Sequence, residues 1–170
     1  MGVDHNGQAL DTHIENRLNL VWLKRDLRLQ DHPPRAEAMQ PPGNVLLFYG
    51  FEPDPLRDPH DDNRRWRFVW PSLMELNQQL QASGSSVFIC HGDVLELVFE
   101  RQGKVGINPM YSHEKVDLNL AFERDKAVAR RCKQAHIPWF EARAGAVLRA
   151  AKNRHDSGKR WCRTMRAPRP

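Results

Sequence analysis

Charged side chains that could bind a ligand or form ion pairs follow the first apolar run of the sequence. The run covers residues 18–23, and charges of both signs alternate directly after it. Arginine pairs with carboxylates directionally and often through two hydrogen bonds, so the two arginines of this loop can pair with its two aspartates. We expect such pairs to fix the loop, and the same side chains are available to a ligand. The charged residues of the loop are Lys24, Arg25, Asp26, Arg28 and Asp31.

His113 and Glu114 form the best polar pair elsewhere in the chain. A carboxylate can fix the tautomer of an adjacent imidazole, which would let the pair bind the polar edge of a ligand. A surface or loop-capping role suits the same pair equally well. Trp22 and Phe51 could wall a planar ligand, although buried aromatic residues belong to the core more often than to binding sites.

Other chemical signals are weaker. His60, Asp61 and Asp62 lack spaced partner ligands, so we interpret them as a solvated acidic loop and not as a metal site. Residues 91–93 resemble a turn that accepts phosphate at a helix start, but the chain has no Gly-x-Gly-x-x-Gly or Gly-Lys-Ser/Thr motif. No Ser/His/Asp or Cys/His set has an order or spacing that supports hydrolase chemistry.

Five short apolar stretches alternate with helical patterns along the chain. This alternation predicts an α/β fold with a five-stranded, doubly wound parallel sheet of the Rossmann-like type. In such a sheet the loops at the carboxyl ends of the strands converge on a ligand crevice, and we expect those loops at 24–32, 50–60, 91–93 and 111–117. The expected strands are 18–23, 45–49, 87–90, 105–108 and 137–142, and helices are expected to begin near residues 36, 63, 93 and 123.

Three regions are expected to depart from this regular pattern. Pro71 lies inside the helical stripe 63–81, where proline removes a hydrogen bond and clashes with the preceding turn, so we expect a kink or a late helix start. Residues 1–17 are polar and aperiodic, which predicts an unpacked leader. Residues 150–170 are expected to be a basic linker or tail, disordered past about Asn153.

The 170 residues suffice for one domain with a real core, which we place at 18–149. The net charge of +5 is uneven, since residues 149–170 hold eight Lys/Arg and one acid while the other 148 residues carry about −2. A high isoelectric point is therefore no argument that the body binds nucleic acid. No apolar stretch reaches the length of a membrane helix and no secretory signal is present, so we expect a cytoplasmic protein with its three cysteines reduced.

The segment Trp22 to Pro33 reads Trp-Leu-Lys-Arg-Asp-Leu-Arg-Leu-Gln-Asp-His-Pro and resembles the opening signature of the DNA photolyase and cryptochrome family. In that family a first strand runs into an Arg-Asp-Leu-Arg loop and then Asp-Asn-Pro. Pro34, Arg35 and Pro71 depart from the family pattern and are expected to weaken local helices. Further matches occur in the family's order at Asp61 with 64–69, at 92–93, 111–114, 124–128 and 145–148.

The resemblance implies the amino-terminal α/β domain of this family, which commonly holds an antenna chromophore: a folate, a deazaflavin or a flavin. It also implies that FAD and the DNA-binding cleft belong to a helical second domain, where full-length relatives carry out light-driven repair of pyrimidine dimers. The sequence resembles the first domain only, so we do not expect it to catalyse repair alone. The candidate antenna-binding residues are Trp22, Lys24, Arg25, Asp26, Phe51, His113 and Glu114.

The implied partner is the FAD-binding domain, against which residues 150–170 would pack. DNA would be contacted only weakly through this tail, and no membrane contact is expected. Two other functions stay open. The strand-end crevice could serve a small nucleotide-binding module, or the +7 tail could make the chain a nucleic-acid-binding fragment whose affinity falls steeply with salt.

Overall fold

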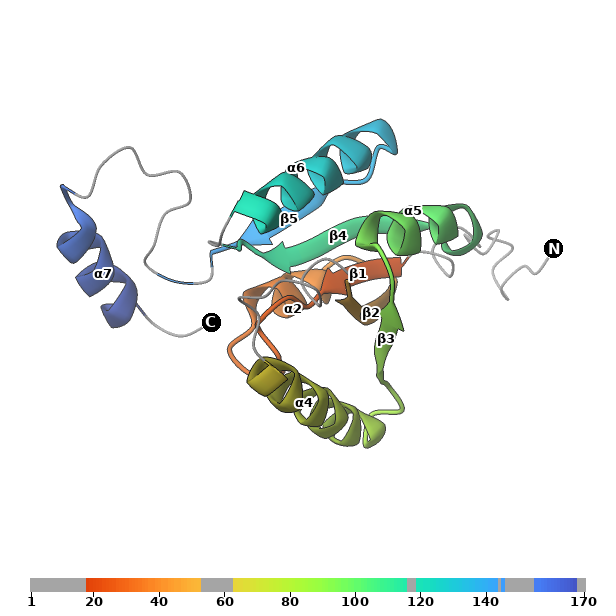
Figure 1. Ribbon diagram of the computed structural model, residues 1–170, viewed down its shortest axis with the longest axis horizontal. Coiled ribbons are helices and arrows are strands. Elements are labelled where there is room, and N and C mark those ends of the chain that lie inside the picture. Colours follow the sequence, from red (N-terminus) through yellow and green to blue (C-terminus); the bar gives the residue numbers. More distant parts are fainter. Residues whose placement is uncertain (1–17, 53–62, 116–118, 144, 146–154, 168–170) are drawn as a thin grey trace, which may run out of the picture.

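A five-stranded sheet forms the centre of the computed structural model (Figure 1), which describes residues 18–52, 63–115, 119–143, 145 and 155–167. All four pairs of neighbouring strands are parallel. Helices connect the strands along the chain. The predicted α/β fold with a doubly wound parallel sheet is confirmed.

The strand order creates a switch point in the middle of the sheet. The strands are β1 (Leu18–Trp22), β2 (Asn44–Phe51), β3 (Val87–His91), β4 (Ile107–His113) and β5 (Trp139–Ala142). Their order is β3-β2-β1-β4-β5, so the chain builds outward from β1 to β3 and then returns to add β4 on the other side of β1. Ligands of open α/β sheets bind at the carboxyl ends of the strands where the order reverses, here between β1 and β4.

The fourth strand differs from the prediction. The sequence indicates a short strand at 105–108, but β4 begins at Ile107 and continues to His113. Its pairing with β1 shifts by one residue beside Pro109, because proline cannot donate a ladder hydrogen bond and is tolerated at such an irregularity. The apolar pattern is broken by that proline, which explains why residues 111–113 are expected in a loop when they belong to a buried strand.

Helices cover both faces of the sheet. Figure 1 shows α5 (Val94–Val105) and α6 (Asn119–Gln134) on one side and α4 (Asn63–Gln81) on the other, and α2 (Pro33–Ala38) joins the α4 side. Side chains of a strand alternate between the two faces. Leu20 and Trp22 pack in the core under α5 and α6, whereas Val21 and Leu23 pack in the core under α2 and α4. The sheet therefore separates two apolar cores.

The tail contains a helix, so the expectation of disorder past Asn153 is wrong for part of it. Helix α7 (Ser157–Arg166) has no buried residue. Trp161 and Met165 are exposed and lie one turn apart, and Lys159 and Arg163 share the opposite side by helical spacing. The expectation rested on charge density and overlooked this one-sided pattern.

Two expectations from composition can be compared with the structure. No helix among the described residues combines the length and the apolar character needed to span a bilayer. All three cysteines are free, in agreement with the expected reduced thiols. Burial raises the pKa of the Cys132 thiol to about 11, so this side chain stays protonated.

Pro71 lies well inside α4, which begins at Asn63 and continues to Gln81, so a late helix start is wrong. We expect Pro71→Ala to raise the free energy of unfolding by about 1–2 kcal/mol, because alanine restores a helical hydrogen bond and removes the ring clash. Urea unfolding followed by circular dichroism measures the change. Gln78→Ala, at another exposed position of α4, is the control and should shift stability by less than about 0.5 kcal/mol. A less stable Pro71→Ala variant would contradict this account of the helix.

Candidate functional site

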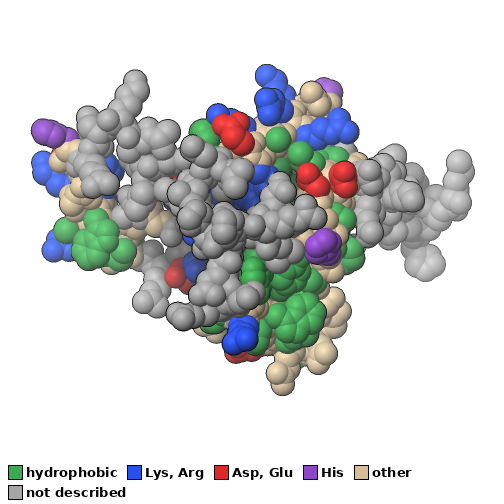
Figure 2. All heavy atoms as spheres, viewed as in Figure 1, with side chains coloured by type: hydrophobic (Ala, Val, Ile, Leu, Met, Phe, Trp, Pro, Cys, Tyr) green, Lys and Arg blue, Asp and Glu red, His purple; other side chains and the backbone are tan. Residues whose placement is uncertain are grey.

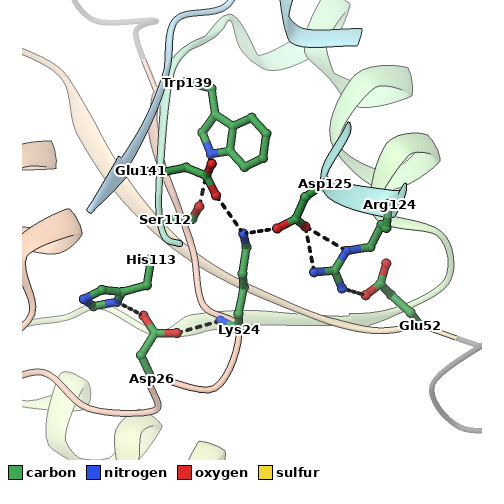
Figure 3. A network of polar contacts seen from close by, with 9 residues as sticks. All are labelled: Lys24, Asp26, Glu52, Ser112, His113, Arg124, Asp125, Trp139 and Glu141. Carbon is green, nitrogen blue, oxygen red and sulfur yellow. Dashed lines mark hydrogen bonds and ion pairs between the residues drawn. The ribbon is translucent and has the colours of Figure 1, made fainter. Parts of the chain in front are cut away.

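A crevice lies at the carboxyl ends of the central strands, beside the switch point of the sheet. Lys24 follows β1, Glu52 follows β2, and Arg124 reaches the same place from α6. Figure 3 shows these polar side chains turned toward one another. The crevice is lined by Trp22, Leu23, Lys24, Tyr49, Gly50, Glu52, Trp66, Lys115 and Arg124.

Lys24 places a buried ammonium group between two carboxylates. Its Nζ lies 3.1 Å from Asp125 Oδ2 and 3.3 Å from Glu141 Oε1, and the lysine side chain is 4% exposed. The same Nζ lies 4.4 Å from the ring centroid of Trp22 and 5.2 Å from that of Trp139. Burial lowers the pKa of Lys24 below its ordinary value, while the two carboxylates oppose the shift. Lys24 thus ties the end of β1 to α6 and β5.

Arg124 joins this cluster to the end of β2. Its Nη2 and Nε donate to Asp125 Oδ1 at 2.9 and 3.2 Å, and its Nη1 donates to Glu52 Oε2. The guanidinium carbon lies 4.7 Å from the ring centroid of Trp22, within the range of a cation–π contact. Burial raises the pKa of Glu52 above its ordinary value, although the charge and hydrogen bond of Arg124 oppose this. Arg124 therefore spans the crevice from Asp125 to Glu52.

A second buried cluster lies around Asp26, in the loop after β1. Asp26 Oδ2 receives hydrogen bonds from His32 Nε2 at 2.6 Å and from His113 Nδ1 at 2.5 Å, and Oδ1 accepts from the backbone N–H of Lys24 at 2.9 Å. Burial disfavours the charge of Asp26, but the bonds from His113 and His32 outweigh it and hold the pKa of Asp26 below its ordinary value. Asp26 is therefore an ionised acceptor, and both imidazoles donate to it.

His32 reaches Asp26 because the chain reverses just before it. Asp31 has a φ of 52°, in the left-handed region, and His32 then caps α2. The Nδ1 of His32 accepts from the backbone N–H of Arg35 at 3.1 Å. Since Nδ1 is an acceptor, the ring proton of a neutral His32 is on Nε2, where it is donated to Asp26.

The same three side chains could also be considered as metal ligands. The ligand atoms of Asp26, His32 and His113 all lie within 4.8 Å of one another. A metal ion bound to His32 Nε2 would require the ring proton on Nδ1, which faces the N–H of Arg35. The hydrogen bonds therefore favour proton donation over metal binding, and we interpret the cluster as the group that holds the loop after β1 against β4.

Four of the seven predicted site residues lie in or beside the crevice. Trp22 and Lys24 line it, and Asp26 and His113 form the adjacent buried cluster. The carboxylate that bonds His113 Nδ1 is Asp26, whereas the sequence indicates the neighbouring Glu114. The backbone N–H of Glu114 donates to a carbonyl of β5 at 2.7 Å, so this residue contributes to the joining of β4 and β5.

Phe51 and Arg25 do not line the crevice. The ring of Phe51 packs against Trp66 of α4 with centroids 5.7 Å apart, and Arg25 is exposed. For Arg28 the contact expected within the loop takes another form, because Arg28 Nε donates to the backbone carbonyl of Asp31 at 3.0 Å and not to a carboxylate. The loop is fixed as predicted, but through a backbone oxygen and through the histidines.

The sequence reading missed four side chains that complete the network. Arg124 and Asp125 belong to a stretch that resembles the family, but the sequence assigns them no role. Glu141 alternates with apolar neighbours in the last strand, and this period-two pattern could have placed it on one face of the sheet. No local signal marks Glu52 as the partner of a residue 72 positions away.

The ion pairs nearly fill the crevice. Its free volume is about 30 Å³, whereas pockets for drug-sized ligands measure about 300 Å³ or more. Gly50 leaves no additional space for a ligand, because Val94 already fills the position beside it. A Cβ built on Gly50 would lie 3.1 Å from a methyl group of Val94. The described residues supply aromatic walls and charged groups, but a flavin, deazaflavin or folate ring does not fit while Arg124 and Glu52 are paired.

A five-stranded parallel sheet with helices on both faces and a charged crevice beside its switch point defines a Rossmann-like α/β domain. The model of the DNA photolyase family matches residues 19–167. The chain belongs to this family, and it forms the family's α/β domain. The resemblance drawn from the segment Trp22 to Pro33 is thereby confirmed.

Curated relatives include both repair enzymes and cryptochromes. The chain is 28% identical to cryptochrome-2 of Gallus gallus over 119 residues, covering 68% of this chain and 20% of that protein. It is 26% identical to a deoxyribodipyrimidine photo-lyase of Synechococcus over 118 residues, covering 69% of this chain and 24% of that protein. The chain thus spans between a fifth and a quarter of the length of these relatives.

Solved structures of photolyases share the fold. An archaeal photolyase of Sulfolobus tokodaii, described as containing two FAD molecules and implying a novel light-harvesting cofactor, superposes with a TM-score of 0.72 at 19% identity. The match covers 91% of this chain and 36% of that one. A class III photolyase of Agrobacterium tumefaciens gives a TM-score of 0.69 at 20% identity, covering 86% and 28%.

Lys24→Met should lower the free energy of unfolding by about 3–5 kcal/mol, because it leaves Asp125 and Glu141 without the ammonium group between them. Chemical denaturation measures the loss. The control is Lys126→Met, which removes a pair with Glu123 whose side chains are 49% and 65% exposed. That variant should change stability by less than about 1 kcal/mol. Equal effects in the two variants would refute a structural role for the buried ammonium.

Asp26 should make stability depend on acid pH. Its pKa in the folded chain is below the ordinary 3.8, so its contribution is complete above that pH and is lost as the pH falls below it. Asp26→Asn should cost about 2–4 kcal/mol at neutral pH, because the amide cannot accept from two imidazoles as a carboxylate does. Urea unfolding over a pH series should show this difference shrinking in acid. A difference that is constant down to about pH 3 would contradict the role of the ionised carboxylate.

Proposed function

We propose that this chain is the antenna domain of a light-driven flavoprotein and that its strand-end crevice receives a planar second chromophore, a folate, a deazaflavin or a flavin. The observation that carries the proposal is the position of the crevice at the carboxyl ends of β1 and β2, beside the β1–β4 switch point, with Trp22 in its wall. Lys24 and Arg124 lie over this ring as cations. Such groups suit a planar ring that carries polar or anionic substituents.

A bound antenna would supply light absorption and the transfer of excitation to FAD. The residues of this chain would bind and orient it. The Arg124–Glu52 pair has to separate to admit the ring, because the free volume is only about 30 Å³. Lys24 keeps its two carboxylates behind the crevice during this opening. In a longer relative, light-driven, FAD-dependent repair of pyrimidine dimers would take place in the second domain.

We infer that α7 packs against that FAD-binding domain. Its side chains Trp161 and Met165 are 56% and 59% exposed and form one apolar side of the helix. An apolar stripe of this kind is stable when another element covers it. The opposite, basic side, with Lys159 and Arg163, would remain exposed and could contact nucleic-acid phosphates only weakly.

The test is a titration of the 170-residue chain with FMN, a deazaflavin and methenyltetrahydrofolate. At least one of them should quench tryptophan emission and raise the melting temperature, because a ring in the crevice lies next to Trp22. Trp22→Phe and Trp66→Phe, which alter the two tryptophans that line the crevice, should each reduce the quenching, whereas the control Trp161→Phe on α7 should preserve it.

The proposal is wrong if none of the three ring compounds changes its own fluorescence, the tryptophan emission or the melting temperature of the chain. Stabilisation by AMP or ATP without any response to the rings would instead support the nucleotide-binding module.

A further inference from the structure

The geometry points to Glu52 as an internal anion that occupies the ligand site: we propose that a phosphate or carboxylate group of the ligand displaces Glu52 from Arg124. The inference rests on the proposed function and adds two features to it. The ligand carries a negative charge, and one particular side chain has to move to admit it.

Arg124 is built to receive such a group. Its Nη2 and Nε are held by Asp125 Oδ1, and its guanidinium group lies over Trp22. Only Nη1 is engaged by Glu52 (Figure 3). If Glu52 leaves, Asp125 and Trp22 still hold the guanidinium in place with Nη1 directed into the crevice. The guanidinium group of Arg124 is therefore already oriented to bind an anionic group of a ligand.

The charges lining the crevice favour an anion once Glu52 has moved. Of the described side chains that line it, Lys24, Lys115 and Arg124 are cationic and Glu52 alone is anionic. Asp125 and Glu141 bind Lys24 and are not part of the lining. The ligand charge would thus replace the charge of Glu52 and preserve the balance of the lining.

Glu52 is suited to release because burial makes its ionised form costly. Desolvation raises the pKa of Glu52 against the opposing effects of Arg124 and Lys115, and the nearby Asp93 adds to the rise. Asp26 behaves oppositely, since the hydrogen bonds of its two histidines hold its pKa low. Of these two carboxylates, Asp26 is fixed and Glu52 is the one that a competing anion can replace.

The experiment measures the binding of inorganic sulfate to the 170-residue chain by calorimetry at low ionic strength. Glu52→Gln should bind sulfate about tenfold or more tightly than the unaltered chain, because the competing carboxylate is gone. Glu123→Gln, which removes an exposed carboxylate next to Arg124 in sequence, is the matched control and should bind as the unaltered chain does. Adding Arg124→Gln to Glu52→Gln should abolish the gain.

Glu52→Ala serves as a second variant, and near-ultraviolet circular dichroism verifies that each variant is folded. If the Glu52 variants bind sulfate no more tightly than Glu123→Gln, or if the gain survives the loss of Arg124, the proposal is wrong.

A second comparison separates this proposal from the antenna function. FMN and riboflavin share a ring and differ by a phosphate, so Glu52→Gln should improve FMN binding more than riboflavin binding. A sulfate gain without binding of either flavin would support the anion site and overturn the antenna role. Equal flavin binding by the unaltered chain and Glu52→Gln, with no sulfate gain, would overturn the displacement of Glu52 and support the antenna role.

Discussion

The ammonium group of Lys24 is the constraint on which the strand-end region depends. It lies between carboxylates from α6 and β5 and close to the rings of Trp22 in β1 and Trp139 in β5, so three segments meet at one buried charge. Removing such a charge from water costs several kcal/mol, and only well-placed partners compensate for it. This requirement fixes where α6 and β5 stand relative to β1, and it explains why the crevice is narrow.

Asp26, which is buried, and Glu52, which is partly buried, have different surroundings. Asp26 is surrounded by donors and holds the loop after β1 against β4. Glu52 is also shielded from water, but it accepts fewer hydrogen bonds than Asp26 does. Burial therefore raises the pKa of Glu52. Carboxylates whose environments shift their pKa values in opposite directions are frequent at functional sites, and Glu52 is the one that we propose a ligand displaces.

The layered architecture follows from local patterns, and the polar network does not. Four of the five strands are recognisable as short apolar runs, three of which, β1, β2 and β3, supply side chains to both cores. Pro109 obscures the fourth strand by breaking that pattern. Trp22, Lys24 and Asp26 are recognisable because they end the first run. Lys24 and Asp125 are 101 residues apart, however, and nothing near either residue specifies the other. Such pairing depends on how the helices pack on the sheet.

The left-handed backbone of Asp31 has a consequence for how this position can vary among sequences. At a φ of 52° a side chain with a branched or bulky β-carbon is strained, and glycine, asparagine and aspartate are tolerated best. The side chain of Asp31 is exposed, so the restriction comes from the main chain alone. The chain reversal that turns His32 inward therefore limits which residues can occupy position 31. This exposed position accepts few residue types, as is usual for positions in the core.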